Sequence, residues 1–212
     1  MRRLPVYLII DTSGSMIGEP IEAVKVGLQT MTSALRTDPY ALETVHLSII
    51  TFSGQAAQTV PLTELVQFQL PELHANGTTA LGEALALLAQ CIERDVKRTT
   101  AESKGDWKPV CFLLTDGRTT DDLNRGIEAL RRVKVGTLVA CAAGPAADTS
   151  ELRKITESVV SLDTADSNAL KAFFQWVSAS VSVSSQKVER GAKEVDGLSE
   201  LPPLPPEINP AM

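Results

Sequence analysis

Short apolar runs alternate with segments of helical periodicity from the start of the chain to about residue 184. This alternation is typical of a mostly parallel sheet with helices on both faces. We expect strands at 4–10, 44–53, 109–115, 135–142 and 158–162, with a weaker edge strand at 56–62. The periodicity predicts helices over 20–36, 81–98, 121–133, 149–156 and 167–183. The predicted fold class is therefore α/β, with a Rossmann-like, doubly wound sheet and one antiparallel edge strand.

The composition suits one large folded domain followed by a different kind of segment. A chain of 212 residues with 43% hydrophobic composition is long enough for one well-buried core. Five of the twelve prolines fall in the last eleven residues, where they favour extended backbone. We expect a folded domain over 1–184 and a flexible, proline-rich tail over 185–212. The tail is expected to be solvated or loosely packed, although docking on an aromatic groove of a partner is an alternative.

Hard oxygen ligands gather directly after the first apolar run. Asp11-Thr12-Ser13-Gly14-Ser15 follows residues 4–10 and provides one carboxylate and two hydroxyls in a tight turn. The alternating side chains of Asp11, Ser13 and Ser15 can face one point when the backbone curls. Ligation by oxygen alone suits Mg²⁺ or Mn²⁺ better than Zn²⁺. A metal site is therefore the first hypothesis.

Two further segments can contribute oxygen atoms to the same site. The loop 76–82 ends at a predicted helix start and contains Thr78 and Thr79, while the strand at 109–115 stops at Asp116. In a parallel sheet Asp11 and Asp116 both follow the carboxyl ends of strands, where ligands bind in open α/β folds. Each motif alone is also typical of a structural turn. Their combination predicts a divalent cation site with at least one position open to an outside ligand.

The order Asp-x-Ser-x-Ser, Thr, Asp resembles the metal-ion-dependent adhesion site (MIDAS) of the von Willebrand factor A domain family. The resemblance covers about residues 4–184. Thr79 matches the family's threonine because it stands three residues before Gly82, and Thr78 is the alternative because residues 76–78 depart from the family's double glycine. The metal ligands that the resemblance implies are Asp11, Ser13, Ser15, Thr79 and Asp116.

Within that family, the motifs at 11–16, 18–21, 79–85 and 113–122 are similar to the TerY group of tellurium-resistance proteins. The resemblance implies a protein-interaction module in which a partner's Asp or Glu completes the coordination of one Mg²⁺ or Mn²⁺. It also implies a bacterial tellurite or stress response, with a protein kinase and a PP2C-type phosphatase as partners. Some relatives carry a cysteine-rich, zinc-binding extension, and this chain has the proline-rich segment instead.

Two other functions compete with an interaction module. A divalent ion between Asp11 and Asp116 could activate water, as in metal-dependent phosphohydrolases. Against this, the motifs have no neighbouring general base, phosphate-binding loop or second cluster of acids. An ion that only ties three loops together is the other alternative. We expect a binding protein rather than an enzyme.

The remaining features exclude several classes of protein. A net charge of −6 with scattered Lys and Arg disfavours nucleic-acid binding. No run of about 18 apolar residues predicts a membrane span, and the first apolar run is interpreted as a core strand rather than a signal peptide. Cys91, Cys111 and Cys141 stand apart among apolar residues, which predicts buried thiols in a reducing, cytoplasmic compartment. His46 and His74 are isolated and are expected to be structural or solvated.

Overall fold

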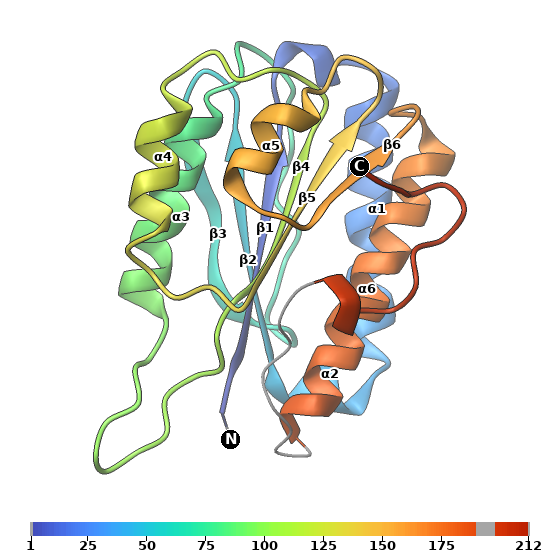
Figure 1. Cartoon of the computed structure of the whole chain (residues 1–212). Helices are drawn as coiled ribbons and strands as arrows, with labels where there is room; N and C mark the ends of the chain where they lie inside the picture. Colours follow the sequence, from blue (N-terminus) through green and yellow to red (C-terminus); the bar gives the residue numbers. More distant parts are fainter. Residues whose placement is uncertain (1, 190–197, 212) are drawn as a thin grey trace.

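A seven-stranded sheet forms the middle layer of the structure (Figure 1). The computed structural model describes residues 2–189 and 198–211. The spatial order of the strands is β3-β2-β1-β4-β5-β6-β7. All neighbouring pairs are parallel except the two edge pairs, β2 with β3 and β6 with β7. The strands are β1 (Leu4–Asp11), β2 (Val45–Phe52), β3 (Ala56–Glu64), β4 (Val110–Thr115), β5 (Thr137–Ala143), β6 (Val159–Leu162) and β7 (Asn209–Pro210).

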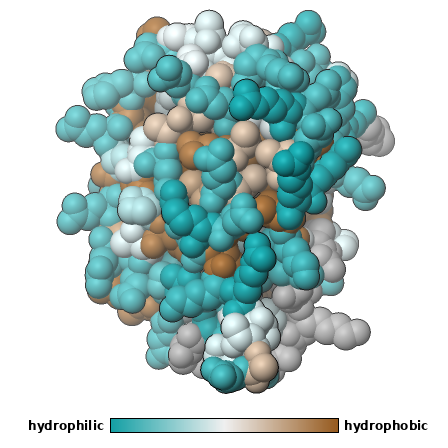
Figure 2. Space-filling view, turned by 90° about the vertical axis from the view of Figure 1, so that its left-hand side faces the viewer, coloured by the Kyte–Doolittle hydropathy of each residue, from teal (hydrophilic) through white to brown (hydrophobic). Residues whose placement is uncertain are grey.

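Helices cover both faces of this sheet, as the sequence predicts. On one face α1 and α6 pack together, and Gly27 of α1 lies so close to the ring of Phe174 that a Cβ there would clash with it. On the other face α3 and α4 pack together, and their outer surface is mostly hydrophilic (Figure 2). The helices are α1 (Glu19–Arg36), α2 (Pro39–Thr44), α3 (Leu81–Asp95), α4 (Leu123–Leu130), α5 (Thr149–Ile155) and α6 (Ser167–Glu189).

The central strand β1 explains why the apolar runs fold in this way. Every residue of Leu4–Asp11 is buried. Because successive side chains of a strand point to opposite faces, Val6 and Leu8 join the core under α1 and α6, whereas Tyr7 and Ile9 join the core under α3 and α4. A continuous apolar run is therefore what a strand between two helical layers requires.

The predicted sheet and helices are confirmed, with differences at the ends of elements. The edge strand predicted at 56–62 is β3, and it is antiparallel as expected. The short helix α2 and the strand β7 were not predicted. Asp38 begins α2, because its side chain accepts a hydrogen bond from the N–H of Tyr40 at 3.0 Å. None of the helices in the described residues is both long and apolar enough to cross a bilayer.

The end of the chain packs on the domain where the structure describes it, which differs from the expected solvated tail. Leu201 and Ile208 are buried. The indole Nε1–H of Trp176 donates to Pro202 O at 3.0 Å, and β7 pairs with β6. Prolines lack an N–H but keep a carbonyl acceptor, so a proline-rich segment can still be bound through its carbonyls. Helix α6 continues past the predicted boundary at residue 184, and residues 190–197 of the predicted tail lie outside the described residues.

Candidate metal centre

The pairing of β1 with β4 brings the two predicted acids to one edge of the sheet. Asp11 is the last residue of β1, and Asp116 directly follows β4. The two strands are parallel, and Ile10 lies opposite Leu114. Both carboxylates therefore stand at the carboxyl ends of central strands, at the top of Figure 1. This edge is where open α/β sheets place their ligand sites.

Two hydrogen bonds fix the Asp11 carboxylate. The backbone N–H of Ser13 donates to Oδ1 at 2.8 Å, and the Thr115 hydroxyl donates to Oδ2 at 2.6 Å. Asp11 has no solvent-exposed area. Burial raises the pKa of the Asp11 carboxyl, and the hydrogen bonds from Ser13 and Thr115 oppose that rise. The anion is therefore rigidly held and poorly solvated, which a bound cation would offset.

Ser13, Ser15 and Asp116 form one chain of oxygen atoms. The hydroxyl oxygens of Ser13 and Ser15 lie 3.0 Å apart, and the Ser15 hydroxyl donates to Asp116 Oδ1 at 2.7 Å. Burial also raises the pKa of the Asp116 carboxyl, against the effect of the Ser15 hydrogen bond. Ser13 and Asp116 are buried, whereas Ser15 is exposed. The chain thus runs from the protein interior to its surface.

The structure separates the two threonines between which the sequence left a choice. The Thr79 hydroxyl oxygen lies 3.4 Å from the position that a Cβ would take on Gly117, and the Ser15 hydroxyl lies 3.8 Å from the same point. The Thr78 hydroxyl instead lies beside Gly54. Thr79 is buried and Thr78 is exposed. Thr79 therefore lies with the oxygen cluster, whereas the Thr78 hydroxyl lies at Gly54.

Backbone hydrogen bonds hold the first two loops together. Gly14 N–H donates to Gly77 O at 2.9 Å, and Asn76 N–H donates to Thr12 O at 2.9 Å. Gly77 has a φ of +72°, which strongly favours glycine there. In this conformation the Gly77 carbonyl accepts the hydrogen bond from Gly14 in the Asp11–Ser15 turn. The turn and the threonine loop therefore form one unit.

Asp121 connects the threonine loop to the loop after β4, a role that sequence reasoning missed. Its carboxylate accepts hydrogen bonds from the backbone N–H groups of Gly82 at 2.8 Å and Glu83 at 2.7 Å, at the first turn of α3. Asp122 caps α4 instead, by accepting from Arg125 N–H at 3.3 Å. The sequence predicted that both acids belong to the helix that follows them. The run of four polar residues from Thr119 to Asp122, longer than one cap needs, was the available signal.

The oxygen cluster suits a small hard cation in its chemistry. It offers two carboxylates and three neutral hydroxyls, which are the oxygen ligands that Mg²⁺ and Mn²⁺ prefer. Among the described residues, no group of three or more His, Cys, Asp or Glu side chains is arranged to hold a metal. A zinc-type cluster is thus not seen in that part of the chain. Any cation here would need the hydroxyls as well as the acids to fill its coordination positions.

Neither histidine belongs to the cluster. His46 stands near the start of β2, at the opposite end of that strand from the site, and its Nδ1 lies 3.3 Å from Thr44 O. Burial lowers the pKa of His46. His74 is exposed next to Glu72 and lines a hollow of about 250 Å³ together with Thr12 and Asn76. The expectation that Cys91, Cys111 and Cys141 are buried thiols is confirmed.

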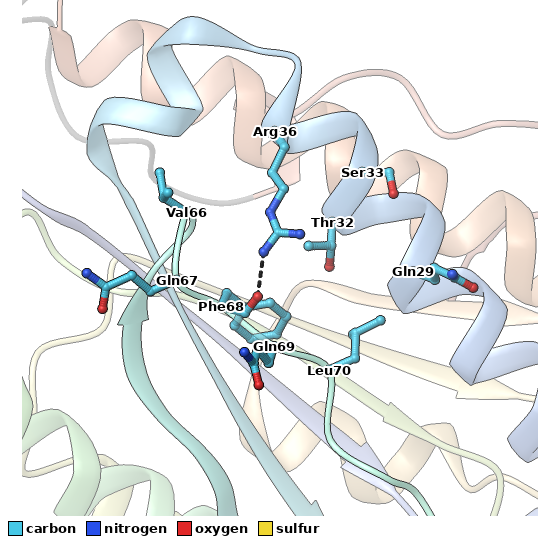
Figure 3. A pocket seen from close by; sticks show the side chains of 9 residues that line it. All are labelled: Gln29, Thr32, Ser33, Arg36, Val66, Gln67, Phe68, Gln69 and Leu70. Atoms are coloured by element: carbon cyan, nitrogen blue, oxygen red, sulfur yellow. Dashed lines mark hydrogen bonds between the residues drawn. The ribbon is translucent and has the colours of Figure 1, made fainter.

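A hollow of about 500 Å³ lies away from the oxygen cluster, between α1 and the segment 66–70 (Figure 3). Arg36 reaches across it and donates to the carbonyls of Leu65 and Phe68. None of the predicted metal ligands lines this hollow. The candidate metal centre is therefore not part of this groove.

Comparisons with known proteins agree with this fold. A model of the von Willebrand factor type A domain matches residues 6–176. Uncharacterized protein sll0103 of Synechocystis sp. is 32% identical over 146 residues, which cover 66% of this chain and 30% of that protein. A solved von Willebrand factor type A structure from Catenulispora acidiphila is similar with a TM-score of 0.58 and 24% identity, covering 86% of this chain and 43% of that one.

A second solved structure is similar and contains a metal. Proximal thread matrix protein 1 from the mussel byssus, with a zinc-occupied MIDAS motif, gives a TM-score of 0.60 at 20% identity, covering 87% of this chain and 46% of that one. At these identities the two structures show a shared fold. The chain spans less than half the length of each of these three proteins.

Proposed function

Because the chain belongs to the von Willebrand factor type A domain family, we propose that it is a metal-dependent protein-interaction module. Domains of this family commonly bind protein partners through a divalent metal and generally act as binding modules rather than enzymes. The observation that carries the proposal is the convergence of three loops on one oxygen cluster. The residues that would bind the ion are Asp11, Ser13, Ser15, Thr79 and Asp116.

The donor set favours Mg²⁺ or Mn²⁺ and leaves the ion able to bind one more anion. Two carboxylates match the charge of a divalent cation, and the three hydroxyls are neutral. Neutral ligands cancel less of the cation's positive charge than further carboxylates would, so the ion attracts an additional anion more strongly. An incoming carboxylate therefore gains more from the bond than it would at an all-acid site.

A partner's Asp or Glu can approach from the exposed side of the cluster. Ser15 is exposed there, and Ile17, two residues later in the same turn, is 64% exposed. An exposed large apolar side chain beside a charged centre provides contact area for a protein partner. We propose that the partner's carboxylate completes the coordination while its neighbouring residues pack on Ile17.

Calorimetric titration with Mg²⁺ and Mn²⁺ tests the ligand assignment. Thr79→Val is expected to weaken metal binding by roughly tenfold or more, because it removes a hydroxyl from the metal. Thr78→Val, one residue away, is the matched control and is expected to leave the affinity unchanged because its hydroxyl faces Gly54. Asp11→Ala is expected to abolish binding. Equal effects of the two valine variants, or unchanged affinity in Asp11→Ala, would contradict the proposed site.

Water-proton relaxation with bound Mn²⁺ distinguishes a binding ion from a purely structural one. An open coordination position holds exchanging water, which enhances relaxation, and a partner's carboxylate that displaces this water lowers the enhancement. A site closed by ligands from this chain gives little enhancement from the start. That result would contradict a partner-binding role for the ion and support the alternative in which the ion only holds the three loops together.

A more specific proposal concerns the biological setting. It rests on the similarity of the motifs at 11–16, 79–85 and 113–122 to the TerY group. We propose a cytoplasmic protein of a bacterial tellurite or stress response, with a protein kinase and a PP2C-type phosphatase as partners. Co-purification of these two enzymes in Mg²⁺, lost in EDTA and in Asp11→Ala, would support it. If the chain instead binds other partners in a metal-dependent way, it is still an interaction module, but the proposed tellurite or stress response is wrong.

A further inference from the structure

A pocket of about 490 Å³ lies beside the amino ends of β1 and β4, opposite to the candidate metal centre. In Figure 1 this edge is at the bottom, where the N-terminus lies and the loop between α3 and β4 turns back. Ile92 and Val96 at the end of α3, Trp107 and Pro109 before β4, and Val133 after α4 give it apolar walls. Its volume is within the range of small-molecule sites.

Positive charge dominates the lining of this pocket. Six basic and two acidic side chains line it, although the chain as a whole has a net charge of −6. Both acids already have basic partners. Arg3 contacts the two carboxylate oxygens of Asp106, at 3.0 Å and 2.5 Å, and Arg98 lies 3.5 Å from Glu93. The positive charge of the pocket is therefore not balanced by its own acids.

Three of the remaining basic side chains come from two segments of the chain. They are Lys97 after α3, and Arg132 and Lys134 after α4. In the described part of the chain, none of the three forms an ion pair with a carboxylate. All three are exposed and can turn toward a bound anion.

Arg2 is held in place without losing its charge. Its Nε donates to Gly105 O at 2.7 Å, its Nη2 donates to Asp106 O at 3.2 Å, and its guanidinium carbon lies 3.9 Å from the centre of the Trp107 ring. These partners are neutral carbonyls and an aromatic face. The indole Nε1–H of the buried Trp107 has no acceptor among the described residues. The wall thus holds one preorganised cation beside the other basic side chains.

We infer that this pocket binds a phosphate monoester group. Such a group carries about two negative charges near neutral pH and several acceptor oxygens, which Arg2, Arg132, Lys97 and Lys134 together can match. A single carboxylate would leave most of this positive charge unbalanced. Nucleic acid is disfavoured, because the basic side chains surround one pocket instead of forming a stripe, and the chain is acidic overall.

The first experiment is a ¹⁵N NMR titration of the full chain in EDTA. The probes are inorganic phosphate, adenosine monophosphate, a phosphoserine peptide and the same peptide with glutamate at that position. The expected result is saturable shifts of the Trp107 indole N–H and of the 97–106 amides, with none at 11–15. Binding of the monophosphate but not the peptide identifies a small molecule as the source of the phosphate, and the reverse identifies a phosphoprotein.

A pair of double variants tests the pocket itself. Arg132→Glu with Lys134→Glu reverses two charges at exposed positions and is expected to weaken binding by roughly tenfold or more. Arg153→Glu with Lys154→Glu makes the same change in charge on exposed residues of α5 that do not line the pocket, and it is expected to have little effect. Equal losses in the two double variants would overturn the inference.

Two further results would also overturn it: no saturable shifts with any phosphate probe, or equally tight binding of the glutamate peptide. Because the titration contains EDTA, its outcome is independent of the metal proposal. The variant Asp11→Ala is expected to bind the phosphate probe as the unchanged chain does. Failure of one proposal therefore leaves the other intact.

Discussion

The carboxylate of Asp11 depends on a residue that does not belong to the proposed ligand set. Thr115 is completely buried, and its hydroxyl both donates to Asp11 Oδ2 at 2.6 Å and accepts from Gly117 N–H at 3.3 Å. The same hydroxyl therefore orients the acid of one loop and the backbone of the next. Outer hydrogen bonds of this kind tune metal affinity because they fix the direction of the ligand's lone pairs.

Replacing Thr115 with valine preserves the shape of the side chain and removes only the hydroxyl's hydrogen bonds. The free energy of unfolding is expected to fall by about 1–3 kcal/mol, because a buried carboxylate and a backbone N–H lose their partner. Mg²⁺ affinity is expected to fall as well. Urea unfolding and calorimetry measure the two effects, and Thr115→Ser, which keeps the hydroxyl, is expected to restore the metal affinity. Unchanged metal affinity in Thr115→Val would show that this hydroxyl does not position Asp11.

At this scale the sequence was informative about residue types and less so about contacts. Asp11, Ser13, Ser15 and Asp116 could be singled out because carboxylates and hydroxyls in turns after apolar strands are chemically conspicuous. Thr115 could not, because a threonine at the end of an apolar strand looks like an ordinary β-strand residue. The difference in burial between Thr78 and Thr79 arises only in the folded loop, so the sequence left both as candidates.

Among the elements, α3 has an unusual beginning. The residue before it, Ala80, has no side chain that can cap a helix. The missing cap comes from Asp121, which also accepts from the Thr119 hydroxyl at 2.7 Å. The start of α3 is therefore built from the loop after β4. Because Thr79 directly precedes Ala80, the same contact positions a proposed metal ligand.

Adjacent acids allow this arrangement to be tested. Asp121→Ala is expected to lower the free energy of unfolding by about 1–2 kcal/mol, the usual cost of a lost helix cap. It is also expected to weaken Mg²⁺ binding because the Thr79 loop loses its anchor. Asp122→Ala removes a cap only from α4 and should leave the metal affinity unchanged. The assignment fails if both variants weaken Mg²⁺ binding equally in calorimetry.

The shortest helix of the α type and the shortest strand, α2 and β7, were not predictable, for a physical reason. Helices such as α1 and α3 extend over several turns, so the apolar spacing repeats often enough to be recognised. The helix α2 has six residues and β7 has two, which is too few for either periodicity to appear. Strand β7 also depends on pairing with β6, which is a contact distant in sequence.

At the scale of the whole molecule, the end of the chain contributes to the core under α1 and α6. Leu201 and Ile208 join that core, and Ala211 N–H donates to Val159 O at 3.0 Å. A sequence rich in proline lacks helical or strand periodicity, so its burial could not be anticipated from pattern alone. The folded unit thus includes residues far beyond the last predicted helix.

Ile208→Ala tests this contribution. The free energy of unfolding is expected to fall by about 1–3 kcal/mol. The loss cannot be larger than the free energy that binds this segment to the domain, because the segment can detach locally. Glu207→Ala, at an exposed neighbouring position, is the control and should change the stability little. Urea denaturation followed by circular dichroism provides the measurement. A loss of stability no greater than that of the control would mean that the segment does not support the core.

Both outer strands of the sheet carry a proline, Pro61 in β3 and Pro210 in β7. The pairing of β3 with β2 also shifts register beside Ile49, and β7 is only two residues long. An edge of this kind offers few evenly spaced N–H and C=O groups to an incoming strand. We therefore expect concentrated solutions of the chain to resist edge-to-edge aggregation, so that assembly with other molecules proceeds through loops and side chains instead of sheet extension.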